Sequence, residues 1–210
     1  MPPRNACFIS FRHGQHELTQ RFVAELHAGL SAELEIQLGR DVGVFLDETR
    51  LQGGDFFNEA IAEQLCESSC LVMIYTPSYF DLAHTYCARE YKAMLGLEAA
   101  RLAKLQLDRT HGLIIPVVFR GGKHMPKEIR DVRHCHDFAG FLLTNRNLAR
   151  HPRYAPAIQE MAEYISDRHR ELATIQNGCR DFRLPSEDEI RPWLATAVAT
   201  PMKLPGRTDD

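Results

Sequence analysis

Short apolar runs alternate along the chain with longer segments in which apolar residues recur every three or four positions. Continuous apolar runs are typical of buried strands, and the recurring pattern is typical of amphipathic helices. Five stretches have the first pattern, the last of them weakly: residues 7–11, 42–46, 70–75, 113–119 and 136–138. Because helical segments separate these runs, the order predicts an α/β protein with a doubly wound, five-stranded parallel sheet.

Three helical segments have a clear inward stripe. The longest begins at residue 17 and ends at Gly39, with the inward residues Leu18, Phe22, Val23, Leu26, Leu30 and Leu34. A second segment has the inward residues Phe57, Ile61 and Leu65. The third covers residues 153–172, with Ile158, Met161, Ile165 and Leu172 facing inward. These stripes predict helices that each pack one face on the sheet.

Two of the predicted strands lead to specific expectations. Residues 42–46 are apolar throughout, which predicts that helices cover both faces of this strand. Pro116 lies inside the run 113–119 and lacks a backbone N–H group. It therefore argues against a regular central strand, unless it lies at a bulge or at the strand's end.

The chain divides into a domain at residues 6–172 and a C-terminal extension at residues 173–210. The extension has a turn at Pro185-Ser186 and the only tryptophan, Trp193. Pro192 is expected to prevent a continuous helix there. The last residues, from Pro205 on, are expected to be disordered.

Composition and charge narrow the class of protein. A chain of 210 residues that is 44% hydrophobic can bury one good core. The net charge of −3 offers no basic surface for nucleic acid or for an anionic membrane. No apolar run approaches the roughly 20 residues of a membrane helix, and no secretory signal precedes the first strand. A cytoplasmic protein is therefore expected.

The cysteines are scattered, and three of them lie in apolar runs. The six are Cys7, Cys66, Cys70, Cys87, Cys135 and Cys179. This distribution predicts reduced thiols, in agreement with a cytoplasmic location. Cys66 and Cys70, together with the run His134-Cys135-His136, suggest zinc ligands only weakly because no CxxC pair is present, and no metal site is expected.

An aromatic residue and a carboxylate follow the third predicted strand. Tyr86 and Glu90 are four residues apart, so they lie on one face at the start of a helix. Open α/β sheets bind their ligands at the carboxyl ends of the strands, where this helix begins. The pair suits a ligand that is part flat ring and part polyol, although such pairs also occur at helix starts without a function.

Five segments, in this order and spacing, resemble the successive sequence boxes of a TIR (Toll/interleukin-1 receptor) domain of the bacterial type. They are CFISFRH at 7–13, VGVFLDETRLQGGDFF at 42–57, CLVMIYTPSYF at 70–80, TYCAREY at 85–91 and IIPVVF at 114–119. The resemblance covers roughly residues 6–170 and implies a flavodoxin-like fold. Many bacterial TIR domains, including those of antiphage defence, cleave NAD+ between nicotinamide and ribose.

The resemblance also implies which residues bind and cleave NAD+. Glu90 matches the catalytic glutamate of the enzymatic members, and Tyr86 takes the position of an aromatic residue that is usually Trp. Further positions that line the NAD+ site match Phe11, Arg12, Asp47 and Phe56. Two of these have plain structural alternatives: Arg12 as a salt bridge at a strand end, and Phe56 as a core residue. NAD+ is then the substrate, and no cofactor is expected.

In the family, the loop that corresponds to residues 47–55 packs against a neighbouring TIR domain and helps to complete the active site. The resemblance therefore implies self-association through this loop and activation by assembly, with a solvated loop as the alternative. A separate sensor or effector protein is a further expected partner. The alternative to an enzyme is a non-catalytic TIR–TIR adaptor or a host-directed TIR mimic. The Tyr86–Glu90 pair favours the enzyme because an adaptor does not need it.

Overall fold

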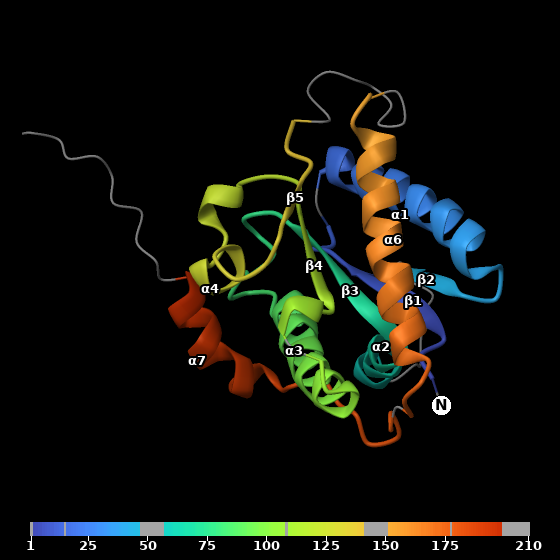
Figure 1. Cartoon of the computed structure of the whole chain (residues 1–210). Coiled ribbons are helices and arrows are strands. Elements are labelled where there is room, and N and C mark those ends of the chain that lie inside the picture. Colours follow the sequence, from blue (N-terminus) through green and yellow to red (C-terminus); the bar gives the residue numbers. More distant parts are fainter. Residues whose placement is uncertain are drawn as a thin grey trace, which may run out of the picture.

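Five parallel strands form one sheet with helices on both faces (Figure 1). The computed structural model describes residues 2–14, 16–46, 57–107, 109–140, 151–176 and 178–198. The strands are β1 (Asn5–Ser10), β2 (Gly43–Leu46), β3 (Ser68–Tyr75), β4 (Ile114–Val118) and β5 (His136–Asp137). Their order is β2-β1-β3-β4-β5. This is the flavodoxin-like order, and it confirms the predicted fold class.

The helices divide between the two faces of the sheet. They are α1 (Glu17–Leu38), α2 (Phe57–Cys66), α3 (Tyr86–Leu105), α4 (Lys127–Arg130), α6 (Tyr154–Leu172) and α7 (Glu187–Val198), with the 3-10 helices η1 (Arg109–His111) and η2 (Gly122–His124). Right-handed crossovers from β1 to β2 and from β2 to β3 run in opposite directions, so α1 lies on one face and α2 and α3 lie on the other. Helix α6 packs beside α1 and contacts β1 and β3 (Figure 1). None of the helices within the described ranges is long and apolar enough to cross a membrane.

The buried stripe of α1 is shorter than the sequence predicts. Phe22, Leu26, Leu30 and Leu34 are fully buried, but Leu18 is 37% exposed. Each step of four residues advances about 40° around a helix of 3.6 residues per turn, so a stripe with this spacing gradually leaves the face that packs on the sheet. The inward residues predicted for α6 are all buried.

The expectation that helices cover both faces of the second strand is wrong. Strand β2 lies at the edge of the sheet and pairs with β1 alone among the described strands. Gly43 is exposed, and the other three residues of the strand are half-buried. An apolar run shows that a strand packs against something, but its neighbours in the sheet depend on the crossovers.

Pro116 lies in the interior of β4 without breaking the sheet. Leu71 donates its N–H to Leu113 O, and Phe119 donates its N–H to Tyr75 O. The odd-numbered residues of β4 therefore direct their backbone N–H and C=O groups toward β3. Pro116 therefore directs its nitrogen toward the β5 side. Because β5 pairs with β4 only from Val117 on, no ladder bond is lost at Pro116.

The expectation that Pro192 prevents a helix is also wrong, because α7 runs through this residue. Its start has a capping box: Glu189 N donates to Ser186 Oγ at 3.3 Å, and Ser186 N donates to Glu189 Oε2 at 2.6 Å. Ile190 and Leu194 are buried. Packing of this face offsets the hydrogen bond that Pro192 cannot donate. Residues 199–210, for which partial disorder is expected, lie outside the described residues.

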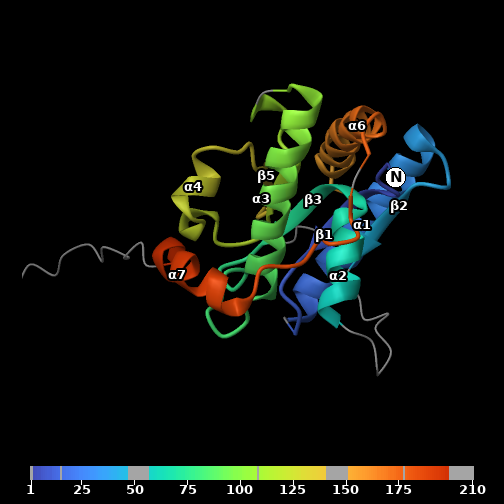
Figure 2. The same cartoon turned by 90° about the horizontal axis from the view of Figure 1, so that it is seen from below.

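Segment 178–198 lies against α3 and α4 (Figure 2). The ring of Trp193 stacks on that of Tyr91, with 5.7 Å between the centroids, and meets the Phe80 ring edge-on. The indole Nε1 donates to Glu128 Oε1 at 2.5 Å. The start of the extension is therefore part of the packed structure.

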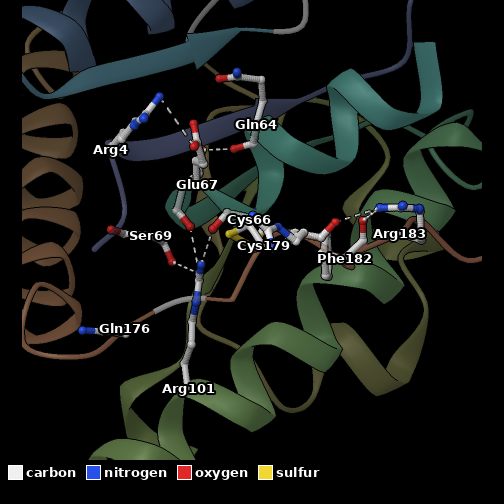
Figure 3. Close-up of a disulfide and its surroundings, with 12 residues drawn as sticks. Arg4, Gln64, Cys66, Glu67, Ser69, Arg101, Gln176, Cys179, Phe182 and Arg183 are labelled. Atoms are coloured by element: carbon white, nitrogen blue, oxygen red, sulfur yellow. Dashed lines mark hydrogen bonds and ion pairs between the residues drawn. A yellow bond between two sulfur atoms is a disulfide. The ribbon is translucent and has the colours of Figure 1, made fainter. Parts of the chain in front are cut away.

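A disulfide joins Cys66, the last residue of α2, to Cys179 (Figure 3). Their Cα atoms are 5.7 Å apart. The prediction of reduced thiols is therefore wrong for these two residues, while the thiols of Cys7, Cys70, Cys87 and Cys135 are reduced. The pairing depends on the path of the C-terminal segment past the end of α2. The spacing of the cysteines in the sequence does not predict this path.

Arg101 holds the connection between α2 and β3 next to this disulfide (Figure 3). Its buried guanidinium donates to the carbonyl oxygens of Cys66 at 2.6 Å, Ser68 at 2.8 Å and Ser69 at 3.2 Å. Burial lowers its pKa to about 10. These three bonds satisfy carbonyl groups at the end of a helix and the start of a strand.

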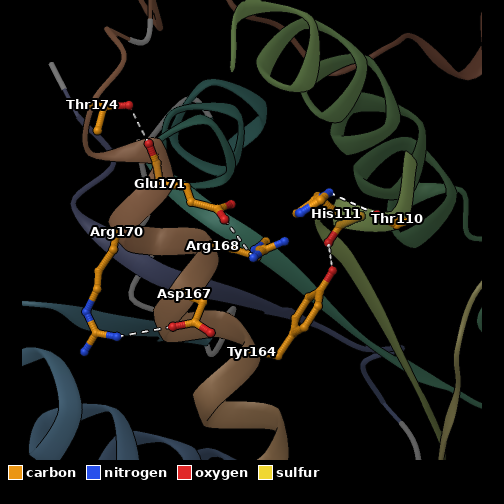
Figure 4. Close-up of polar contacts among 9 residues, drawn as sticks. Thr110, His111, Tyr164, Asp167, Arg168, Arg170, Glu171 and Thr174 are labelled. Carbon is orange, nitrogen blue, oxygen red and sulfur yellow. Dashed lines mark hydrogen bonds and ion pairs between the residues drawn. The ribbon is translucent and has the colours of Figure 1, made fainter. Parts of the chain in front are cut away.

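Helix α6 is attached to the amino end of β4 by a side chain. The Tyr164 hydroxyl donates to Gly112 O at 2.6 Å, next to His111 (Figure 4). On the neighbouring turn, Arg168 and Glu171 form an ion pair of 2.8 Å. The Tyr164 hydrogen bond fixes α6 at the amino end of β4, whereas the ion pair lies within the helix.

Candidate functional site

Glu90 lies where the sequence predicts it, at the carboxyl ends of the strands and one turn into α3. The helix begins at Tyr86, so the predicted spacing of the pair is present. Ser10, the last residue of β1, donates a hydrogen bond from its Oγ to Glu90 Oε2 at 2.5 Å. Glu90 as a whole residue is 3% exposed. The structure thus places a buried carboxylate at the end of the sheet that binds ligands in open α/β folds.

A second hydroxyl group continues the contact from Ser10. The Tyr79 hydroxyl oxygen is 2.6 Å from Ser10 Oγ, and both residues are fully buried. Since the single proton of Ser10 is donated to Glu90, Tyr79 is the donor to Ser10. Burial, reinforced by Cys87 and Glu90, raises the pKa of Tyr79 well above its ordinary value, which keeps the phenol protonated. The relay Tyr79–Ser10–Glu90 therefore holds the carboxylate in one orientation.

Tyr86 stands at the surface above Glu90, with 39% of its area exposed. The guanidinium carbon of Arg89 is 5.0 Å from the centre of its ring, which is a cation–π contact. Arg89 also donates to Pro185 O at 2.6 Å and to Asn58 Oδ1 at 3.2 Å. Through Arg89, the segment before α7 and helix α2 both support the start of α3.

The other predicted NAD+ residues divide into two groups. Phe11 and Arg12 directly follow Ser10, so they lie at the same end of the sheet as Glu90. Phe11 is buried and packs on the ring of His13, with 4.4 Å between the centroids. Arg12 is half-buried and donates to His13 O at 2.8 Å. Asp47, Phe56 and the loop 47–55 lie outside the described residues.

Several residues of this region were missed by the reasoning from sequence. Ser10 contacts Glu90 from 80 positions away, Tyr79 contacts Ser10 from 69 positions away, and Arg89 contacts Pro185 from 96 positions away. In the sequence, the position of Ser10 at the end of an apolar strand was the signal that could have indicated a polar contact at the site. Thr85 Oγ1 is buried and has no hydrogen-bond partner among the described residues. Such a group requires a partner from a ligand, from water or from the rest of the chain.

The zinc combination considered from the sequence does not form. Cys66 is bonded to Cys179, and Cys70 is fully buried, which raises the pKa of its thiol to about 12. A thiol in this environment is neither a ready nucleophile nor a ready metal ligand.

A cavity of about 560 Å³ lies beside the disulfide rather than beside Glu90. Its charged lining residues are Glu59, Glu63, Glu67, Arg180 and Arg183. None of the predicted NAD+ residues that the structure describes lines this cavity. We therefore assign the candidate site to the neighbourhood of Glu90.

Comparison with models of known protein families gives a match over residues 7–150 to the family described as the TIR domain. The match spans more than half of the chain and includes Ser10, Tyr79, Tyr86 and Glu90. No curated protein matches the chain in sequence.

Proposed function

The chain belongs to the TIR domain family, and on this premise we propose that it cleaves NAD+ at the bond between nicotinamide and ribose. Glu90 is the proposed catalytic residue. The observation that carries this assignment is the Glu90 carboxylate itself, held by Ser10 at the carboxyl end of β1 and one helical turn from the half-exposed ring of Tyr86. The family also contains adaptors without this activity, so the assignment depends on these side chains.

Cleavage of the bond between nicotinamide and ribose requires few catalytic groups from the protein. The nicotinamide of NAD+ is cationic and leaves as a neutral base, so no general acid is needed. Positive charge grows on the ribose as the bond breaks. A carboxylate next to the ribose stabilises this charge by the same electrostatic principle that operates in glycoside cleavage. Glu90 supplies the carboxylate, and the relay from Tyr79 through Ser10 orients it.

The neighbouring residues supply binding in this proposal. Tyr86 offers an aromatic face for a flat ring. Arg12 pairs with the pyrophosphate, which a guanidinium recognises well. Phe11, Asp47 and Phe56 line the rest of the nucleotide site. The products are nicotinamide and either ADP-ribose, when one water molecule is consumed, or a cyclic ADP-ribose isomer, when the ribose is attacked by an atom of the same molecule and no water is consumed.

Burial of Glu90 fits a site that assembly completes. Glu90 is 3% exposed, so the ribose reaches the oriented carboxylate only after the surroundings of Glu90 rearrange. Self-association through the loop 47–55 is the proposed trigger, and the isolated subunit is then poorly active. We propose a signalling role in bacterial antiviral defence for such an assembly.

The test is nicotinamide release by the purified full-length chain at high protein concentration. Wild type, Glu90→Gln and Glu35→Gln are incubated with NAD+, and the products are separated by chromatography and identified by mass. Glu35 is a matched control because it is exposed on α1 and makes an ion pair with Arg40, worth about 0–1 kcal/mol. We expect Glu90→Gln to lose about 100-fold or more in rate, and Glu35→Gln to match wild type.

The product masses then distinguish hydrolysis from cyclisation. Equal release by wild type and Glu90→Gln would remove Glu90 from the chemistry. Absence of release from every variant, under conditions where light scattering reports assembly, would reject the enzyme and favour the adaptor.

A further inference from the structure

Two histidines and a glutamate converge at the edge of the sheet, on the side that carries α6. His134 lies two residues before His136, the first residue of β5, and Glu160 lies in the second turn of α6. One potential ligand atom from each residue lies within 4.8 Å of those from the other two. The rings of His134 and His136 are nearly perpendicular, at 87°, with 5.2 Å between their centroids. The rings therefore do not stack on each other.

The path of the chain explains the convergence. Alternate residues of an extended strand point to the same side, so His134 and His136 project together while Cys135 points the other way. Consistent with this, Cys135 Sγ lies 3.4 Å from Arg133 O and 4.0 Å from Met125 Sδ. Glu160 reaches the two histidines from the helix that follows β5 in the chain.

We propose that His134, His136 and Glu160 bind a divalent transition-metal ion, with Zn²⁺ as the best match. Two imidazoles and one carboxylate form a known zinc ligand set that leaves one position for water. Ligand atoms about 2.1 Å from a tetrahedral metal lie about 3.4 Å from one another. The ligand atoms of the three residues are no more than 4.8 Å apart, so small side-chain rotations bring them to this spacing. His134 and Glu160 are exposed, so their side chains have room to rotate.

The metal would join two elements that are otherwise weakly connected at this edge. Strand β5 has two residues, and they pair with Val117 and Val118 of β4. Helix α6 lies on the face opposite to α2 and α3, whereas Glu90 belongs to α3. The ion would therefore fasten β5 to α6 without touching the Glu90 site. This proposal does not depend on NAD+ cleavage.

The test is a Zn²⁺ titration of the full-length chain after removal of metals with a chelator. Heat release and competition with a chromophoric chelator measure the stoichiometry and the affinity. We expect one Zn²⁺ per chain, and visible Co²⁺ absorption typical of a tetrahedral site. His136→Ala and Glu160→Gln are each expected to weaken binding at least about tenfold. Saturating Zn²⁺ is expected to raise the Tm of wild type by about 5 °C and to leave the Tm of His136→Ala unchanged.

Two control variants test the geometry directly. Cys135→Ser changes the residue between the two histidines, and His124→Ala removes an exposed histidine of η2. Both are expected to bind Zn²⁺ as wild type does, and far-UV circular dichroism checks that every variant is folded. Absence of stoichiometric binding by wild type would overturn the proposal. So would equal affinity of wild type, His136→Ala and Glu160→Gln, or a loss of affinity in Cys135→Ser.

Discussion

Replacement of Cys179 by serine is expected to lower the free energy of unfolding by about 3 kcal/mol. The disulfide joins residues 113 positions apart. A loop of this length corresponds to a chain-entropy effect of about 5 kcal/mol at 25 °C, which is an upper value because unfolded chains keep some structure. For a domain of this size, each kcal/mol shifts Tm by about 2–4 °C, so a decrease of about 9 °C is expected.

The non-covalent anchors of the C-terminal segment remain in this variant. Leu184, Ile190 and Leu194 stay buried, and Arg89 still donates to Pro185. Each buried aliphatic side chain contributes about 1.5–3 kcal/mol. The variant is therefore expected to fold with α7 in place, but with this segment unfolding at a lower denaturant concentration than the sheet.

Trp193 allows the release of α7 to be measured separately from the unfolding of the sheet. It is the only tryptophan, and it lies in α7 against Phe80 and Tyr91. Its fluorescence reports release of α7, while far-UV circular dichroism reports loss of the whole fold. Guanidinium titrations compare oxidised wild type, reduced wild type, Cys179→Ser and the control Cys135→Ser. Cys135 is free and half-buried, so its replacement tests the effect of a lost thiol without a lost disulfide.

Two results would refute this reasoning. One is an unfolding midpoint of Cys179→Ser equal to that of oxidised wild type. The other is mass spectrometry of the native, unreduced protein after alkylation under denaturing conditions, if it finds both Cys66 and Cys179 modified as free thiols.

Two further predictions concern polar groups in the core. Arg101→Met removes the donors to three backbone carbonyls and is expected to cost about 3–5 kcal/mol in chemical denaturation, whereas a cost below about 1 kcal/mol would contradict this account. Burial, reinforced by Arg170, lowers the pKa of His169 below its ordinary value of 6.5, and its Nδ1 lies 2.7 Å from Ser69 Oγ. As the pH falls, His169 of the unfolded chain takes up a proton at a higher pH than His169 of the folded chain. The contribution of this neutral histidine to the free energy of unfolding is therefore complete above pH 6.5 and decreases as the pH falls from there through the folded-state pKa. His169→Gln is expected to make the free energy of unfolding less dependent on pH between about 7 and 5. His136, whose pKa is also lowered, leaves a residual slope of the same sign. An unchanged slope in His169→Gln would contradict this prediction.

Local patterns were sufficient for the order and type of most elements. The strands 7–11, 70–75 and 113–119 correspond to β1, β3 and β4, with boundaries shifted by one or two residues. Apolar runs and helical stripes are properties of neighbouring residues, and they report burial directly. The alternation of strands and helices then leaves few topologies, because crossovers are right-handed.

Packing between distant segments decided the features that the local patterns missed. The edge position of β2 follows from the crossovers, and the continuation of α7 through Pro192 follows from burial of its inner face. The Ser186–Glu189 capping box was a readable signal for the start of α7. It shows that one helix-breaking residue is weaker evidence than a helix start followed by an apolar stripe.

The candidate site divides in the same way. The sequence by itself determined that Tyr86 and Glu90 share a helix face at the carboxyl end of a strand, because this spacing is local. Only the tertiary structure brought Ser10 and Tyr79 to Glu90, joined Cys66 to Cys179 and gathered His134, His136 and Glu160 at one edge. Contacts between residues far apart in the chain depend on how the crossovers stack the elements. The local pattern of a single sequence does not encode such contacts.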